Sequence, residues 1–213
     1  MLNRGNKQAR GQLTQKKILE TGLQLFAKKG FEKVTVDEIC RESGTSKGSF
    51  YQHFSSKSTL FLVKFSEADD YYMQVFHSLP KEMDIYQKIE LFVHEVMCFL
   101  NDQMGKELMK VIYSSALLSK EHTYFLNKDR GLTIILRSLA EEVQKEKPHT
   151  SEQEVEDLLT LMNQAMMGMI YHWGVSQCER TLQDLSKYMI HTLIEGIKNS
   201  TVIVNEKKDD SVS

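Results

Sequence analysis

The chain has 213 residues, of which 41% are hydrophobic and 26% are charged, with a formal net charge of −2. This length suffices for one large domain or two small ones, and the apolar fraction is enough to bury a substantial core. Three cysteines without a Cys-x-x-Cys spacing, a polar start and no run of about 18 apolar residues argue against a disulfide framework, a signal peptide and a transmembrane span. We therefore expect a cytoplasmic protein without membrane contact.

The net charge conceals an uneven distribution along the chain. Residues 1–64 contain 12 Lys and Arg against 5 Asp and Glu, a net charge of +7, whereas the remainder contains 15 against 24, a net charge of −9. A basic front end on an acidic body indicates that one end meets a polyanion. A chance division of solvated charges is the alternative interpretation.

The first elements follow from composition and from apolar spacing. Residues 1–12 are rich in Lys, Arg, Asn, Gln and Gly and predict a flexible basic arm. Apolar residues then recur on one face from Thr14 to Lys29, which predicts a helix that ends at Gly30.

Residues 35–57 predict two short helices joined by a tight turn. Thr35 and Glu38 have the spacing of a capping box, which begins a helix. Gly44 stands where this helix should stop, and Ser46 can cap the next one. The second helix is small and polar where it begins and aromatic where it ends. A helix-turn-helix needs this arrangement, because the start of its second helix enters the DNA major groove.

The rest of the chain predicts helices alone, since no alternating strand pattern is sustained. A fourth helix, capped within 55–57 and running to about Leu79, should connect the two parts. Further helices are expected over 84–103, 106–118 and 126–147, the last with a break near Gly131 and a charged loop at 141–149.

Two long helices should finish the fold. Ser151 with Glu154 forms a second capping box, which begins the first of them. After a loop at 177–180, the last helix has an apolar stripe made of Leu182, Leu185, Met189, Leu193 and Ile197. The expected class is all-α: an arm at 1–12, a three-helix domain at 13–55, a larger helical domain at 56–199 and a polar tail at 200–213.

A recurrent order and spacing is formed by Ile18-Leu19, Leu25-Phe26, Gly30-Phe31, Thr35, Ile39, Gly44, Ser46, Gly48, Phe50, Tyr51, Phe54, Lys57 and Leu60. On these residues the chain resembles the tetracycline-repressor (TetR) family over roughly residues 10–64. Departures from the family pattern are mild: Cys40 and Ser43 stand where small residues such as Ala are usual, and Ser58 replaces a common Glu.

The resemblance implies a homodimeric, ligand-responsive DNA-binding regulator, most often a repressor, that binds a palindromic operator. It implies that the last two helices form the dimer interface, although the stripes alone would fit packing within one chain. Lys47 could donate to guanine O6 and N7, Tyr51 could hold a phosphate or only pack, and Thr35 could be only a cap. The expected DNA-binding residues are Thr35, Thr45, Ser46, Lys47, Gly48, Ser49, Tyr51, His53 and Lys57.

A second site is expected in the larger domain, where a small hydrophobic effector would bind. Helices rich in Met and aromatic residues make adaptable apolar cavities. Ordinary core or dimer contacts are the alternative for each residue. The candidate ligand-binding residues are Tyr72, Phe76, Met109, Tyr113, Met162, Met166, Met169, His172 and Trp173.

Other functions have less support in the sequence. No phosphate-cradling glycine loop or His-Glu-x-x-His is present, and the seven histidines lack metal-ligand spacing. We therefore expect no enzyme activity, no metal and no cofactor, and Cys40 is interpreted as a buried structural thiol. The alternative function is a helical small-molecule or protein-binding module without a DNA role, for which the basic first 64 residues have no purpose.

Overall fold

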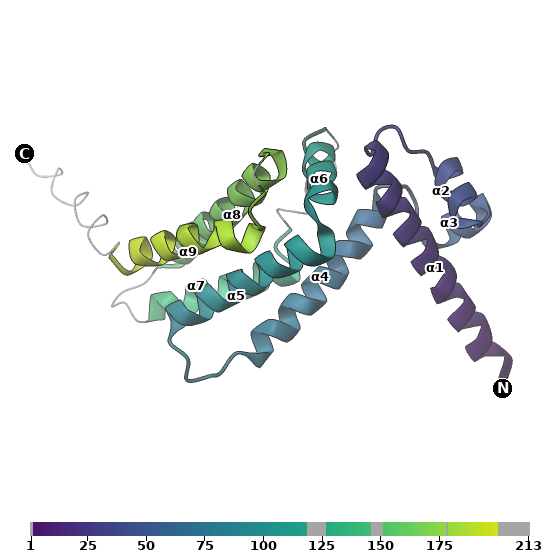
Figure 1. Cartoon of the computed structure of the whole chain (residues 1–213). Helices are drawn as coiled ribbons and strands as arrows, with labels where there is room; N and C mark the ends of the chain where they lie inside the picture. The colour runs from purple at the N-terminus through teal and green to yellow at the C-terminus, as the bar shows by residue number, and fades with distance from the viewer. Residues whose placement is uncertain (1, 119–126, 146–150, 178, 200–213) are drawn as a thin grey trace, which may run out of the picture.

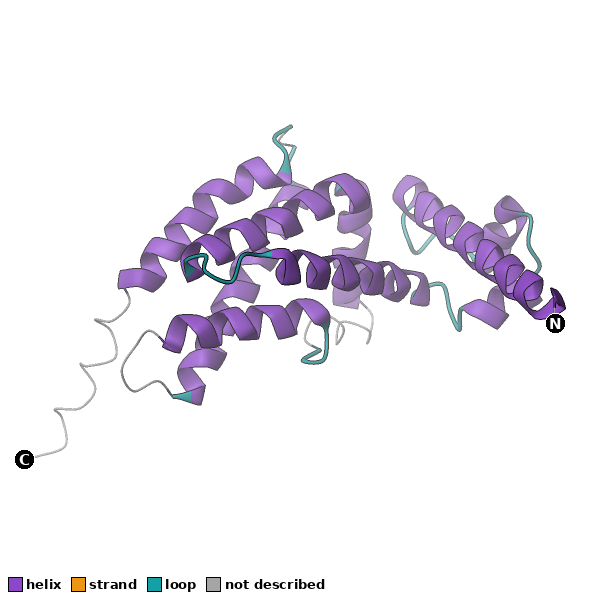
Figure 2. Cartoon of the chain, turned by 90° about the horizontal axis from the view of Figure 1, so that it is seen from below, coloured by secondary structure: helices purple, strands orange, loops and turns teal. Residues whose placement is uncertain are grey.

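The computed structural model describes residues 2–118, 127–145, 151–177 and 179–199, and every regular element within them is helical (Figure 2). Figure 1 shows a small N-terminal group, the head, beside a larger bundle, the body. The all-α class is confirmed, and the predicted polar tail at 200–213 lies outside the described residues. The head comprises α1 (Leu2–Lys29), α2 (Val36–Ser43) and α3 (Lys47–His53).

The body begins with the connecting helix and ends with two long helices (Figure 1). None of the described helices combines the length and the apolarity that a membrane crossing would need. The body comprises α4 (Thr59–Ser78), α5 (Ile85–Phe99), the π-helical turn η1 (Leu100–Met104), α6 (Lys106–Leu118), α7 (Gly131–Lys145), α8 (Glu152–Val175) and α9 (Leu182–Asn199).

The turn between α2 and α3 forms as its local sequence predicts. The Thr35 hydroxyl accepts a hydrogen bond from the Glu38 backbone N–H at 3.2 Å, and the Ser46 hydroxyl accepts one from the Ser49 N–H at 3.1 Å. Gly44 ends α2 in the left-handed conformation with φ of 61°, which a side chain would disfavour. The predicted helix-turn-helix is therefore confirmed.

The first helix is longer than expected. It begins at Leu2 and so includes described residues of the segment for which a flexible arm was predicted, 1–12. Thr14 therefore lies inside this helix, and its hydroxyl donates to the Arg10 carbonyl one turn earlier, at 2.9 Å.

A small aromatic core holds the head together and joins it to α4. Phe26, Phe50 and Phe54 are buried, and the Phe26 and Phe61 rings lie 5.1 Å apart between α1 and α4. Gly22 lies where α1 approaches α4 closely: a Cβ there would come within 2.6 Å of Leu60 Cδ1. The start of α4 is thus packed with the head.

The ends of α4 and α5 differ slightly from expectation. Ser58, rather than a residue of 55–57, stands at the N-cap of α4, and its side chain makes no capping hydrogen bond. Asp84 caps α5 by accepting from the Tyr86 and Gln87 N–H groups at 3.0 and 3.2 Å. The helix expected over 84–103 continues as η1, which ends at Gly105.

A long-range ion pair fixes where α7 begins. Arg130, just before α7, meets the Asp69 carboxylate of α4 at 3.2 Å, and both side chains are largely buried. Asp69 also accepts from the Leu132 N–H at 3.4 Å. The predicted break at Gly131 is therefore the start of the helix, and α7 extends to Lys145 through part of the loop expected at 141–149.

The last two helices pack on the body and leave apolar side chains outside. The Ser151–Glu154 capping box that begins α8 is confirmed. The inward face of α9 differs from the predicted stripe, because Leu185, Met189 and Leu193 are only partly buried at its edge. The buried residues of α9 are Leu182, Ser186, Ile190, Ile194 and Ile197.

Candidate functional site

The outer face of α2, its turn and α3 carries most of the residues expected to bind DNA; we call it the reading surface. Phe50 is fully buried and Phe54 is 2% exposed, so α3 is anchored by its aromatic face. Tyr51, on the other face, is 57% exposed, and its ring meets Phe50 edge-on at 5.4 Å. The division predicted for α3, aromatic residues inward and polar groups outward, is therefore present.

The start of α3 is small and accessible. Gly48 is exposed, and a Cβ there would make only an ordinary contact, 3.7 Å from Ser46 Oγ. No packing within the protein therefore demands a glycine at this position, and the absent side chain leaves room outside the protein. Ser46 and Ser49 exchange a hydrogen bond between their hydroxyls at 3.0 Å, while Thr45 shares one with Ser43 at 2.8 Å.

Lys47 is paired across the turn. Its Nζ lies 2.6 Å from Oδ1 of Asp37, the second residue of α2, and both side chains are more than half exposed. The hydrogen bond to Asp37, followed by its charge, raises the pKa of the Lys47 ammonium. Lys47 therefore stays charged, and Asp37 is a member of this surface that the motif alone did not indicate.

Two other expected residues lie close to structural partners. Thr35 is exposed, and its hydroxyl accepts the hydrogen bond that caps α2, which leaves its O–H donor available. His53 is half-buried where α3 passes α1: a Cβ on Gly11 would lie 3.9 Å from His53 Cε1. The N-terminal half of α1 thus runs beside the end of the reading surface.

Lys57 lies apart from the reading surface and is engaged within the head. Its Nζ donates to the carbonyls of Phe31 at 2.7 Å and Val34 at 3.0 Å. The same ammonium lies 4.2 Å from the centroid of the Phe31 ring. Lys57 therefore fixes the loop between α1 and α2 in this structure.

A cavity of about 620 Å³ lies where the head meets the body. Ala27 and Gly30 at the end of α1 line one side, and residues of α6 and α8 line the others. Figure 1 shows α6 standing between α1 and α8. The lining is mainly apolar, apart from the Glu107–Lys110 ion pair at 2.8 Å; its α6 and α8 members are Glu107, Met109, Lys110, Val111, Tyr113, Ile170, Tyr171, Gly174 and Val175.

The structure places some candidate ligand-binding residues in the lining of this cavity and others in the core. Met109 and Tyr113 line this cavity, and burial raises the pKa of the Tyr113 hydroxyl, which is therefore neutral at physiological pH. Met169 is half-buried and Phe76 packs near Phe92, whereas His172 is exposed. The remaining candidates form part of the core: Tyr72, Met162, Met166 and Trp173.

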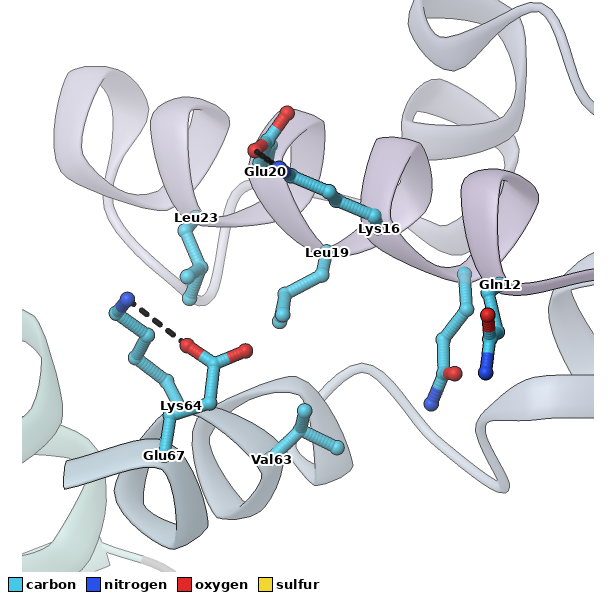
Figure 3. A pocket seen from close by; sticks show the side chains of 9 residues that line it. Gln12, Lys16, Leu19, Glu20, Leu23, Val63, Lys64 and Glu67 are labelled. Atoms are coloured by element: carbon cyan, nitrogen blue, oxygen red, sulfur yellow. Dashed lines mark hydrogen bonds and ion pairs between the residues drawn. The ribbon is translucent and has the colours of Figure 1, made fainter. Parts of the chain in front are cut away.

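A second hollow of about 460 Å³ lies between α1 and α4 (Figure 3). Leu19, Leu23 and Val63 line it, and the ion pairs Lys16–Glu20 and Lys64–Glu67 stand around them at 3.8 and 3.0 Å. Its charged groups balance, so the hollow offers no net charge to select a ligand. Sequence spacing did not predict either hollow, because each joins residues far apart in the chain.

The comparisons with known proteins agree with this geometry. Residues 18–63 match the family described as "Bacterial regulatory proteins, tetR family". The HTH-type transcriptional regulator YerO of Bacillus subtilis is 49% identical over 57 residues, which cover 27% of this chain but only 18% of YerO. The first relatives are thus matched over less than a fifth of their own length.

Similarity to other regulators extends beyond the head. The B. subtilis regulator YdgC is 24% identical over 202 residues, which cover 89% of this chain and 95% of YdgC. The crystal structure of B. subtilis FadR, in complex with stearoyl-CoA, has the same fold, with a TM-score of 0.70 at 16% identity over 84% of this chain and 97% of FadR. The segment that holds the helix-turn-helix thus matches the tetR family of bacterial regulatory proteins, and the chain shares the fold of FadR over 84% of its length.

Proposed function

We propose that the chain is a transcriptional repressor that binds a palindromic operator in the cytoplasm as a homodimer and is released by a small hydrophobic effector. The reading surface is the observation that carries this proposal. It presents a small, polar helix start with a charged lysine, on an aromatic anchor that holds α3 in place. A major groove accepts such a helix start, and phosphates attract the basic head.

The contacts proposed for the reading surface divide into base reading and backbone positioning. Lys47 would donate to guanine O6 and N7, and Gly48 would let the helix backbone approach the bases. Tyr51 is free of the core and would hold a phosphate, as would His53 near the end of α3. Thr45, Ser46, Ser49 and Thr35 would add hydrogen bonds at the rim. Lys57 is left out, since it lies apart from the reading surface and donates to the carbonyls of Phe31 and Val34.

The dimer is proposed to form through the outer faces of α8 and α9. Tyr188 is 80% exposed, and the partly buried Leu185, Met189 and Leu193 flank it. On α8, Leu161 is also exposed. Two copies that bury these stripes against each other would set the heads on half-sites about 34–36 Å apart or a little more.

The effector is proposed to bind in the cavity among α1, α6 and α8. Its volume of about 620 Å³ falls within the range of small-molecule sites, and its lining is mainly apolar. A molecule there would touch both the head and the body, so it can favour one arrangement of the two. It would release DNA only if it binds the non-binding arrangement more tightly.

A footprint on DNA flanking the gene, repeated at several salt concentrations, tests the DNA-binding part. We expect a protected, roughly palindromic site that survives moderate salt. Protection that vanishes with salt and has no preferred sequence would contradict the proposal and leave a ligand- or protein-binding module without a DNA role.

The effector site can be tested with 8-anilinonaphthalene-1-sulfonate as an apolar probe. We expect its fluorescence to rise on binding and Ala27→Phe, which fills the cavity from α1, to weaken that binding. Gln24→Phe, at an exposed position of the same helix, is the matched control and should leave it unchanged. Equal probe binding by both variants would place the effector elsewhere.

A further inference from the structure

Asp37 places a negative charge on the surface that would face DNA. It follows the first residue of α2, and its carboxylate reaches across the turn to the first residue of α3. The Asp37 Oδ1 to Lys47 Nζ distance is 2.6 Å, with side-chain exposures of 64% and 61%. An acidic group here opposes attraction to phosphates, so its position calls for a physical explanation.

Helix stability alone gives Asp37 one use, since an acidic residue in the first turn interacts favourably with the helix dipole. Glu38 already supplies such a charge in the same turn, and it pairs with Lys29 at 2.5 Å instead of facing the reading surface. Helix stability therefore does not explain why the Asp37 side chain points toward Lys47.

The pair responds differently to the two kinds of acceptor that DNA offers. A lysine ammonium has three N–H donors, so Lys47 can keep Asp37 and still donate to a neutral acceptor such as guanine O6 or N7. A phosphate that approaches Lys47 brings a second negative charge close to the Asp37 carboxylate. Repulsion between these charges weakens the phosphate contact but leaves the base contact intact.

We propose that Asp37 is a specificity-determining residue, which withholds Lys47 from phosphates and leaves it available to base edges. This inference rests on the proposed function, because it concerns the choice between operator and random DNA. Asp37 would influence the choice between operator and random DNA through Lys47, without contacting a base itself.

The test compares Asp37→Asn with wild type on the footprinted operator and on random duplex DNA across a salt series. We expect affinity for random DNA to rise by about two- to fivefold, the range that corresponds to one exposed ion pair. The slope of log affinity against log salt should steepen by about 0.9, because Lys47 then neutralises one more phosphate. Operator affinity should change less, so the operator-to-random ratio falls.

Two further variants separate the pair from general electrostatics. Glu42→Gln removes an exposed carboxylate from the same helix, one that pairs with Arg41 at 3.2 Å, and it should leave the ratio unchanged. In a Lys47→Met background, Asp37→Asn should raise affinity for both DNAs equally, because no ammonium is released. Thermal unfolding followed by circular dichroism checks that each variant keeps its helices.

The outcomes distinguish the inference from the proposed function. An unchanged ratio and salt slope in Asp37→Asn, or a fall in the ratio that persists without Lys47, would overturn the role of Asp37 while operator binding stands. A wild-type protein with no preferred site would overturn the proposed function; the salt slope on random DNA would still show whether Asp37 withholds Lys47 from phosphates.

Discussion

At the residue scale, a lysine beside a helix-turn-helix can remain accessible to DNA or can hold the backbone of the protein itself. Lys47 and Lys57 differ in this respect. Lys47 is 61% exposed and pairs with the Asp37 carboxylate, which is 64% exposed. Water or a group on DNA can therefore replace Asp37 as the partner of Lys47. Lys57 instead donates to two backbone carbonyls of the loop between α1 and α2. Buried or partly buried carbonyls need such donors, so Lys57 has a structural reason to stay where it is.

Lys57→Met should therefore destabilise the head. We expect the free energy of unfolding to fall by about 1–3 kcal/mol, since two carbonyls lose a charged donor. Denaturant unfolding measures this change, with the exposed Lys33→Met as the control. A stable variant whose DNA affinity depends less steeply on salt, by about 0.9 in the logarithmic slope, would restore the phosphate role that the motif first suggested.

Glu38 gives a pH dependence of known sign. The hydrogen bond from Lys29, then the charges of Lys29 and Arg41, lower the pKa of Glu38 in the folded protein. A carboxyl with a depressed folded pKa stabilises the fold above its unfolded pKa, and this contribution is lost as the pH falls through the folded pKa. The stability difference between wild type and Glu38→Gln should thus shrink below about pH 4, as thermal unfolding at several pH values would show; a difference that grows on acidification would contradict this sign.

At the scale of elements, the Asp69–Arg130 ion pair joins α4 to the start of α7 within the body. The two side chains are 14% and 7% exposed, and the Arg130 guanidinium lies 5.3 Å from the Phe65 ring centroid. Because α4 also packs on the head through Phe61 and Leu60, this pair connects the body to the helix that carries the head.

Removing one partner of this pair should cost more than removing both. Asp69→Asn should lower the free energy of unfolding by about 3–5 kcal/mol, because it leaves a buried guanidinium without its carboxylate. Asp69→Leu combined with Arg130→Met should recover much of that loss in denaturant unfolding. Asp70→Asn, an exposed neighbour on α4, is the control, and an Asp69→Asn variant as stable as this control would show that the pair is structurally unimportant.

At the scale of the whole molecule, the outward stripes of α8 and α9 decide whether two heads act together. Tyr188→Glu would place a charge in the middle of the proposed interface, where it would lose water without acquiring a partner. Analytical ultracentrifugation should then show a shift from dimer to monomer, with weaker operator binding. Leu62→Glu, which replaces an exposed apolar side chain of α4, should leave the mass unchanged; equal effects of the two variants would argue for a different interface.

The sequence by itself determined the features that form within one or two helical turns. Thr35, Gly44 and Ser46 predicted the turn between α2 and α3, and Ser151 with Glu154 predicted the start of α8, because caps and left-handed glycines act on adjacent backbone groups. The polar outer face and aromatic inner face of α3 followed from the same local spacing.

Only the tertiary structure decided which distant groups meet. Asp69 pairs with Arg130, 61 residues later, at the start of α7, and the Phe31 carbonyl accepts a hydrogen bond from Lys57, 26 residues later. The cavity needs the end of α1 beside α6 and α8, and the inward face of α9 depends on the helices it packs against. Helical spacing shows which residues share a face, whereas burial of that face depends on the partner that covers it, and no single stretch of sequence contains both.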